Sequence, residues 1–125
     1  GLAVEEGLLN LDDKFVKFFP EYVTEDIPNQ LMEMTIREML TMQTCMINYP
    51  NWFYMGLENR CEAYFMTPVG REAGTTWSYD SPGSFMLCCI VEKLTGKPFL
   101  EYLKEKFLED PAKIYREILK AFDLQ

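Results

Sequence analysis

Histidine is absent from this 125-residue sequence, and serine occurs only three times. Without histidine, catalytic triads that depend on it and metal sites with histidine ligands are excluded. No apolar run approaches the roughly 18 residues that a membrane-spanning helix requires, so we expect no membrane span. Nor does the sequence start with a basic segment followed by an apolar run, the pattern of a secretory signal.

Basic residues are scarce as well. Twelve lysines and arginines stand against 20 aspartates and glutamates, which gives a formal net charge of −8. Nucleic-acid binding depends on neutralising phosphates, so we expect no nucleic-acid partner. The excess of acidic residues lies within 1–80, whereas 81–125 are neutral. An acidic surface of this kind usually serves solubility; the alternative is contact with a basic partner or with another part of a larger protein.

The four cysteines form no C-x-x-C pair. A zinc site would need all four thiolates from scattered positions, and the neighbouring Cys88 and Cys89 would point about 100° apart on a helix. We therefore expect neither a metal nor another cofactor. Cys88 and Cys89 lie in an apolar run, which favours buried, reduced thiols and a cytoplasmic location for this chain.

The composition, 48% hydrophobic and 26% charged, predicts a single globular domain over residues 1–125. Near the N-terminus, residues 15–19 predict a short helix that an aspartate caps, followed by a connecting loop over 20–34. Thr35 and Glu38 match a capping box. Apolar residues at helical spacing then predict one buried face. They are Ile36, Met39, Leu40 and Met42.

The C-terminal third carries the clearest helix signals. Ser81 or Asp80 is a candidate cap, Pro82 suits the first helical turn, and Gly96 is a natural C-terminal cap. The apolar run 85–91 predicts a helix that is buried on most sides. Helices are predicted at 35–43, 83–95, 99–109 and 111–124. Residues 45–79 are aromatic-rich and read as an irregular segment. No period-two run is long enough for a sheet, so the fold is predicted to be mainly α.

Three segments of the sequence match a known pattern in register. They are EEGLLNLDDKFVKFFPEY, MTIREMLTMQTC and TTWSYDSPGSFMLCCIVEKLTGKPFLEYLKEKFLEDP. In order and spacing they resemble the serine β-lactamase-like family, which includes class C β-lactamases, D-Ala-D-Ala carboxypeptidases (penicillin-binding proteins) and related esterases. The resemblance covers 3–111 and leaves 112–125 as an extra C-terminal helix. It implies the helical subdomain of an α+β fold, with the central sheet absent from this chain.

The resemblance also implies a candidate site. In that family a serine of an S-x-x-K motif attacks a carbonyl, and the motif's lysine and the tyrosine of a Y-x-N motif transfer the protons. Tyr79 corresponds to this general acid/base tyrosine, and Ser81 to the asparagine or serine that binds substrate. Asp80 lies between them without an assigned role. The resemblance places Trp52 in a loop that helps to wall the cleft.

The sequence departs from the family in two essential motifs. None of its serines begins an S-x-x-K motif, and it contains neither K-T-G nor H-x-G. Because the nucleophile is absent, this chain alone is predicted to be inactive. We interpret it as a fragment of a serine hydrolase that acts on a β-lactam, a D-amino-acid peptide or an ester. Although a cytoplasmic location is favoured for this chain, the parent enzyme can be extracytoplasmic. The alternative is a stand-alone, non-catalytic helical binding protein derived from that family.

A severed helical subdomain should expose the apolar face that packs on the sheet in the family. We therefore expect the isolated chain either to self-associate through this face or to cover it with its last helix.

Overall fold

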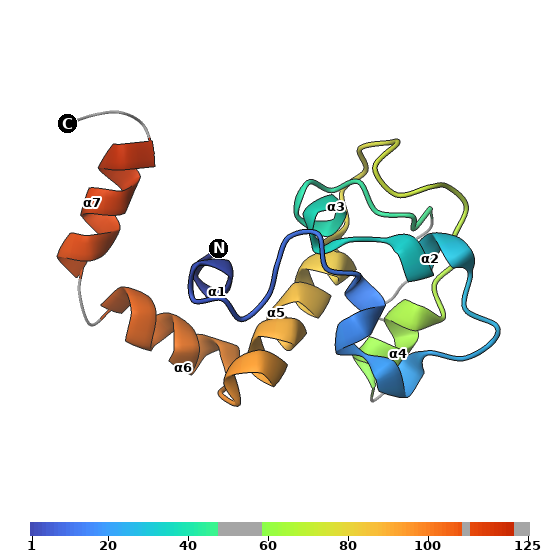
Figure 1. Cartoon of the computed structure of the whole chain (residues 1–125), viewed down its shortest axis with the longest axis horizontal. Coiled ribbons are helices and arrows are strands. Elements are labelled where there is room, and N and C mark those ends of the chain that lie inside the picture. Colours follow the sequence, from blue (N-terminus) through green and yellow to red (C-terminus); the bar gives the residue numbers. More distant parts are fainter. Residues whose placement is uncertain (48–58, 109–110, 122–125) are drawn as a thin grey trace.

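The computed structural model describes residues 1–47, 59–108 and 111–121. Over these residues the chain is helical and has no β-strand, which confirms the predicted mainly α fold (Figure 1). The elements in chain order are α1 (Leu2–Glu5), η1 (Phe15–Phe18), η2 (Pro20–Tyr22), α2 (Asn29–Glu33), α3 (Ile36–Leu40), α4 (Arg60–Phe65), α5 (Ser81–Thr95), α6 (Phe99–Leu103), η3 (Lys104–Leu108) and α7 (Pro111–Ala121). The elements η1 and η2 are 3₁₀ helices, and η3 is a π-helical turn.

Helix α5 lies at the centre of the molecule and contacts α3, α4 and α6 (Figure 1). It begins after Asp80, carries Pro82 in its first turn and ends at Gly96, whose φ of +68° is the left-handed value that glycine tolerates best. These caps are the predicted ones. The helix was predicted to be buried on most sides, but its fully buried surface is narrower. Met86 and Ile90 form one fully buried stripe, and the apolar side chains beside them are half-buried.

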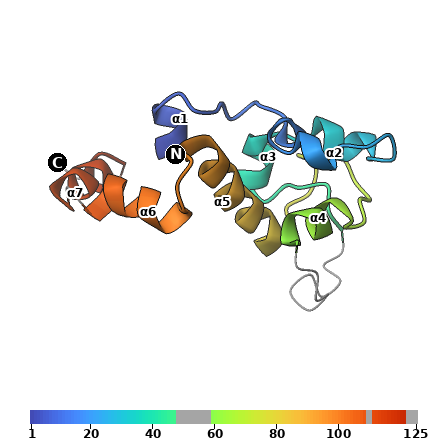
Figure 2. The same ribbon diagram turned by 90° about the horizontal axis from the view of Figure 1, so that it is seen from below.

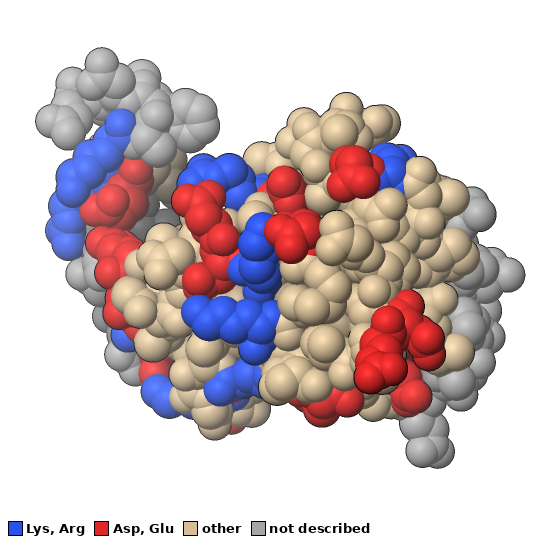
Figure 3. All heavy atoms as spheres, turned by 45° about the vertical axis from the view of Figure 1, so that its right-hand side comes forward, with Lys and Arg blue, Asp and Glu red and all other residues tan. Residues whose placement is uncertain are grey.

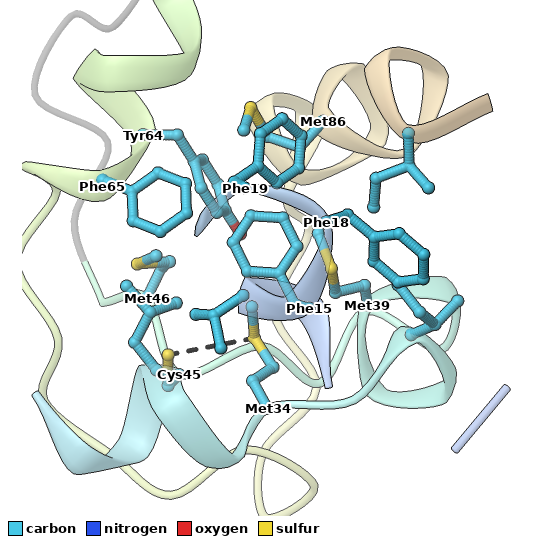
Figure 4. Close-up of a cluster of buried hydrophobic side chains, with 14 of the residues drawn as sticks. Phe15, Phe18, Phe19, Met34, Met39, Cys45, Met46, Tyr64, Phe65 and Met86 are labelled. Carbon is cyan, nitrogen blue, oxygen red and sulfur yellow. Dashed lines mark hydrogen bonds between the residues drawn. The ribbon is translucent and has the colours of Figure 1, made fainter. Parts of the chain in front are cut away.

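The core is built on aromatic rings from η1 and α4 (Figure 4). The Phe15 ring lies 5.3 Å from Phe19, 5.6 Å from Tyr64 and 5.3 Å from Phe65, measured between centroids. The predicted burial of the phenylalanines in 15–19 is thus confirmed. The predicted aspartate cap is wrong. Lys14 occupies the cap position, and the Asp13 carboxylate instead accepts the backbone N–H of Asn10 at 2.9 Å.

Helix α3 shows the predicted capping box. The Thr35 hydroxyl accepts the Glu38 N–H at 3.3 Å, and the Glu38 carboxylate accepts the Thr35 N–H at 2.8 Å. Ile36 and Met39 are buried as predicted, but Leu40 is 51% exposed. The helix ends at Leu40, two residues before the predicted face does, because Met42 takes up a left-handed backbone with φ +57°.

Two segments that were predicted to be irregular contain short helices. Residues 20–34 contain η2 and α2, and the segment 45–79 contains α4. Each has six residues or fewer, and a helix this short is not stable by itself in water. Tertiary packing stabilises them, as the burial of Leu31 in α2 and of Tyr64 in α4 shows. A sequence window of this length carries too little periodicity to predict such helices.

The C-terminal elements extend away from the body that α2 to α5 form (Figures 1 and 2). An ion pair of 2.8 Å between Lys106 and Glu6 ties η3 to the residue that follows α1. Helix α7 packs against η3, and Tyr115 and Ile118 stay exposed on it. One of our two alternatives expected the last helix to cover the apolar face of the body, and in the structure α7 does not do so. Self-association, the other alternative, stays a prediction. No described helix is long and apolar enough to cross a membrane.

Charged side chains of both signs share the face shown in Figure 3, where acidic groups border a band of basic ones. Ion pairs join distant parts of the chain, such as Lys14 with Glu33 at 2.8 Å and Arg37 with Asp12 at 3.0 Å. Both pairs are solvent-exposed, and exposed pairs contribute only about 0–1 kcal/mol each. The stability of the fold therefore rests on the aromatic core and the helix caps.

Cys45 is fully buried in the core, with its Sγ 3.9 Å from the Met34 Sδ (Figure 4). Burial raises the pKa of this thiol to about 12, and the charges of Asp80 and Glu38 act in the same direction against Arg71. Since the unfolded thiol titrates near pH 8.5, stability is fully present below that pH and falls as the pH rises towards 12. At pH 11 we expect this ionisation to lower the free energy of unfolding by about 3 kcal/mol.

Urea unfolding at several pH values between 7 and 11 would measure this loss. Tyrosines and lysines titrate in the same range, so the informative quantity is the difference between the wild-type slope and that of Cys45→Ala. The variant should be less stable at pH 7 but should lose less stability as the pH rises. Parallel slopes for the two proteins would show that Cys45 does not cause the alkaline loss.

Candidate active site

The candidate site is the turn of residues 78–80 together with residues 81–83, the first residues of α5. The end of α3 fixes this turn, since the Ser78 N–H donates to the Met42 carbonyl at 2.8 Å and the Asp80 N–H points at the Met42 Sδ at 3.2 Å. The left-handed backbone of Met42 turns the chain after α3 and brings both of its acceptor atoms to the turn. Met42 therefore meets Ser78 and Asp80, although they follow it by 36 and 38 positions in the sequence.

Asp80 is the structural centre of the turn. Its side chain is buried, with only 1% of the residue exposed. One carboxylate oxygen accepts the Gly83 N–H at 2.7 Å and so caps α5, and the other accepts the Tyr64 O–H at 3.0 Å. The carboxylate thus joins the start of α5 to α4, and it also lies where the positive end of the α5 dipole stabilises a negative charge.

Gly83 is required by this arrangement. A Cβ atom at this position would lie 2.8 Å from the Asp80 Cγ and Oδ2 atoms, closer than such contacts occur in proteins. Any larger residue would push the carboxylate away from its donors. The backbone of α5 therefore approaches the Asp80 carboxylate closely only because residue 83 has no side chain.

The two predicted site residues flank Asp80. Tyr79 is 64% exposed, whereas Ser81 is half-buried in the first turn of α5. The burial of Asp80 thus holds the backbone of both neighbours and leaves the phenol ring at the surface. Their catalytic and substrate-binding roles remain predictions. Trp52, predicted to help wall the cleft, lies outside the described residues.

Sequence reasoning gave Asp80 no catalytic role and left open whether it or Ser81 caps α5; the structure shows that Asp80 is the cap. The signal was present in the sequence, because an aspartate followed by Ser81-Pro82 matches the start of a helix. Its second partner, Tyr64, lies 16 positions away and had no such signal. Among the described residues, no group of histidine, cysteine, aspartate and glutamate side chains could hold a metal ion.

The described residues thus define an all-helical arrangement in which a Tyr-x-Ser turn opens the central helix α5. The family model described as beta-lactamase matches residues 1–111, so the chain belongs to the beta-lactamase family. This confirms the resemblance seen in the sequence.

Two curated relatives come from Bacillus subtilis (strain 168). An N-acetylmuramyl-L-alanine amidase is 27% identical over 95% of this chain, and Penicillin-binding protein 4* is 23% identical over 82% of it. These matches cover 30% and 24% of the relatives' own lengths, respectively. The chain therefore spans less than a third of either relative.

Proposed function

We propose that this chain is the helical portion of a serine hydrolase that transfers acyl groups from an amide or ester, with Tyr79 as its general acid/base and Ser81 as a substrate-binding residue. The observation that carries the proposal is the turn at Asp80, which holds an exposed tyrosine at the entrance of α5 in a member of the beta-lactamase family. The name of one relative, an amidase, supports an amide as the substrate, and the name of the other, a penicillin-binding protein, supports a β-lactam; a D-amino-acid peptide is the further substrate that the family resemblance implies.

In the proposed reaction a serine hydroxyl attacks the substrate carbonyl and forms an acyl-enzyme. A serine hydroxyl is a weak nucleophile, so the oxygen of Tyr79 takes its proton and passes it to the leaving group. A tyrosine needs a nearby cation to act as a base at neutral pH, and the lysine of an S-x-x-K motif supplies it. Because this chain contains no such motif, the serine and the lysine come from outside it, and the chain alone is inactive.

Sequencing the gene on both sides of this segment tests the proposal first. An S-x-x-K motif upstream and a K-T-G or H-x-G motif downstream are expected. The protein that includes them should form a covalent adduct with a fluorescent penicillin, whereas the 125-residue chain should form none. Flanking sequence without these motifs would overturn the proposal in favour of a non-catalytic helical binding protein.

The role of Tyr79 has its own prediction in that longer protein. Tyr79→Phe removes a single hydroxyl from the surface and should slow adduct formation by about 10²–10⁴-fold, the usual contribution of a general acid or base. Tyr115→Phe is the matched control, because Tyr115 is equally exposed, at 65%, but lies on α7. Stopped-flow or gel-based labelling rates would measure both. Equal rates for the two variants would exclude Tyr79 from the chemistry.

A further inference from the structure

Helices α4 and α5 each present a cysteine to the other, and neither cysteine has a part in the proposed function. The Sγ atoms of Cys61 and Cys89 lie 3.7 Å apart, in van der Waals contact, although the residues are 28 positions apart in the sequence. We propose that Cys61 and Cys89 form a reversible disulfide that links α4 to α5 when a small disulfide such as oxidised glutathione is present.

Cys61 and Cys89 are more exposed than Cys45, the thiol in the core. Cys61 and Cys89 are both half-buried, so a small oxidant reaches them, whereas Cys45 is fully buried beside Met34. Cys88 is half-buried too, but it neighbours Cys89 on a helix and so points about 100° away from it. The contact between the sulfurs therefore selects one pair of the four thiols.

The order of the steps follows from the surroundings of the two thiols. Burial, with a further contribution from the neighbouring Cys61, raises the pKa of Cys89 to about 12, so Cys89 keeps its proton at neutral pH. We therefore assign the first attack to Cys61, since a thiol that keeps its proton is a poor nucleophile in disulfide exchange.

The exchange is balanced with one molecule of oxidised glutathione. Cys61 attacks one glutathione sulfur, and the S–S bond of glutathione breaks to release one glutathione thiol. Cys89 then loses its proton to solvent and attacks the Cys61 sulfur, which expels the second glutathione as a thiol. The two protein thiols are oxidised, and oxidised glutathione is reduced to two thiols.

The disulfide would restrain the turn that carries Tyr79. Its closed loop contains residues 62–88 and therefore includes Tyr79, Asp80 and Ser81. Tyr64, which donates to Asp80, lies one helical turn after Cys61 on α4. Fixing α4 against α5 at Cys61 would hold the Tyr64–Asp80 hydrogen bond in place. A loop of this length predicts a rise in Tm on the order of 10 °C.

The purified chain tests this directly. After incubation with oxidised glutathione at pH 8, a thiol assay should find two free thiols in place of four, and peptide mapping should find Cys61 joined to Cys89 within one chain. Dithiothreitol should restore all four thiols and reverse the rise in Tm. Four remaining thiols, stable glutathione adducts or a bond that joins two chains would each overturn the proposal.

Matched serine variants locate the bond. Cys88→Ser should still lose two thiols on oxidation, because Cys61 and Cys89 remain. Cys61→Ser and Cys89→Ser should form no internal disulfide and should show no rise in Tm under the oxidant. An internal bond in Cys89→Ser that contains Cys88 would overturn the assignment. The wild-type mapping decides the pairing even if a variant fails to fold.

Discussion

Replacing Asp80 with alanine should lower the free energy of unfolding by about 3 kcal/mol. The variant loses the cap of α5, which contributes about 1 kcal/mol at a helix N-terminus. It also loses the hydrogen bond that the buried Tyr64 O–H donates to the Asp80 carboxylate, and a hydrogen bond to a charged group contributes about 1.5–3 kcal/mol. Because domains of this size are stable by only about 5–15 kcal/mol, the loss is a large fraction of the total.

Urea unfolding followed by circular dichroism measures this effect. Asp80→Asn keeps the shape of the side chain and one oxygen for the Gly83 N–H, so it should cost about 1 kcal/mol. Tyr64→Phe removes the hydrogen bond that Tyr64 donates to Asp80 but keeps the cap of α5, so its cost should lie between those of Asp80→Asn and Asp80→Ala. If Asp80→Ala costs no more than Tyr64→Phe, the cap of α5 does not contribute to stability.

Gly83→Ala probes the same contact from the other side. Alanine normally stabilises a helix relative to glycine by about 0.5–1 kcal/mol. Here the sign should be reversed, because the new Cβ would meet the Asp80 carboxylate at 2.8 Å. In the Asp80→Ala background the clash is gone, so Gly83→Ala should become neutral or stabilising. Equal effects in both backgrounds would show that the two residues are not coupled.

Replacing Phe15 with alanine should lower the free energy of unfolding by about 3–5 kcal/mol. Its fully buried ring is in contact distance of Phe19, Tyr64 and Phe65, which join η1 to η2 and α4 (Figure 4). Truncation removes these ring contacts and leaves a cavity that the surrounding helices fill only in part. The short helix α4 should lose order first, since packing rather than length stabilises it.

Thermal and urea unfolding of Phe15→Ala and Phe15→Leu together distinguish the contribution of the ring contacts from that of the buried apolar volume. Leucine keeps most of the volume and should cost about 1–1.5 kcal/mol. Hydrogen exchange should then show faster exchange in α4 for the alanine variant than for the leucine variant. A loss below about 1 kcal/mol for Phe15→Ala would contradict the central position of this ring in the core.

The parts of the fold that the sequence predicted are those with local physical causes. A cap joins groups three or four residues apart. The capping box of Thr35 and Glu38 does so through side chains, and Gly96 does so through its backbone N–H, which donates to the Glu92 carbonyl, so both could be recognised from the letters alone. The same holds for the Tyr79-Asp80-Ser81 motif, which lies in one contiguous segment. The family itself was recognisable because three such segments kept their order and spacing, and the family match over 1–111 confirms it.

The predictions that failed concern features that the local sequence pattern alone does not decide. Neither α2 nor α4 has a strong signal, because their stability comes from packing against η1 and α5. The aspartate predicted to cap 15–19 bonds instead to Asn10 and to the side chain of Lys17, and Leu40 faces solvent because α3 ends before the chain turns at Met42. Partners far along the chain stabilise α2 and α4, a backbone turn ends α3 early, and for Asp13 two competing partners three and four residues away replaced the predicted cap.

The sequence by itself determined the helical class, the family, the absence of an S-x-x-K motif from these 125 residues and the choice of Tyr79 and Ser81 as candidate residues. Only the tertiary structure decided that Asp80 is the buried anchor between them, because its bond to Tyr64 joins two helices. Only the tertiary structure, likewise, brought Cys61 to Cys89. The physical reason lies in the range of the interactions. Helix caps act over three or four residues, so a short stretch of sequence shows them. Contacts between α4 and α5 form when apolar faces are buried together, and the sequence pattern does not specify which faces meet.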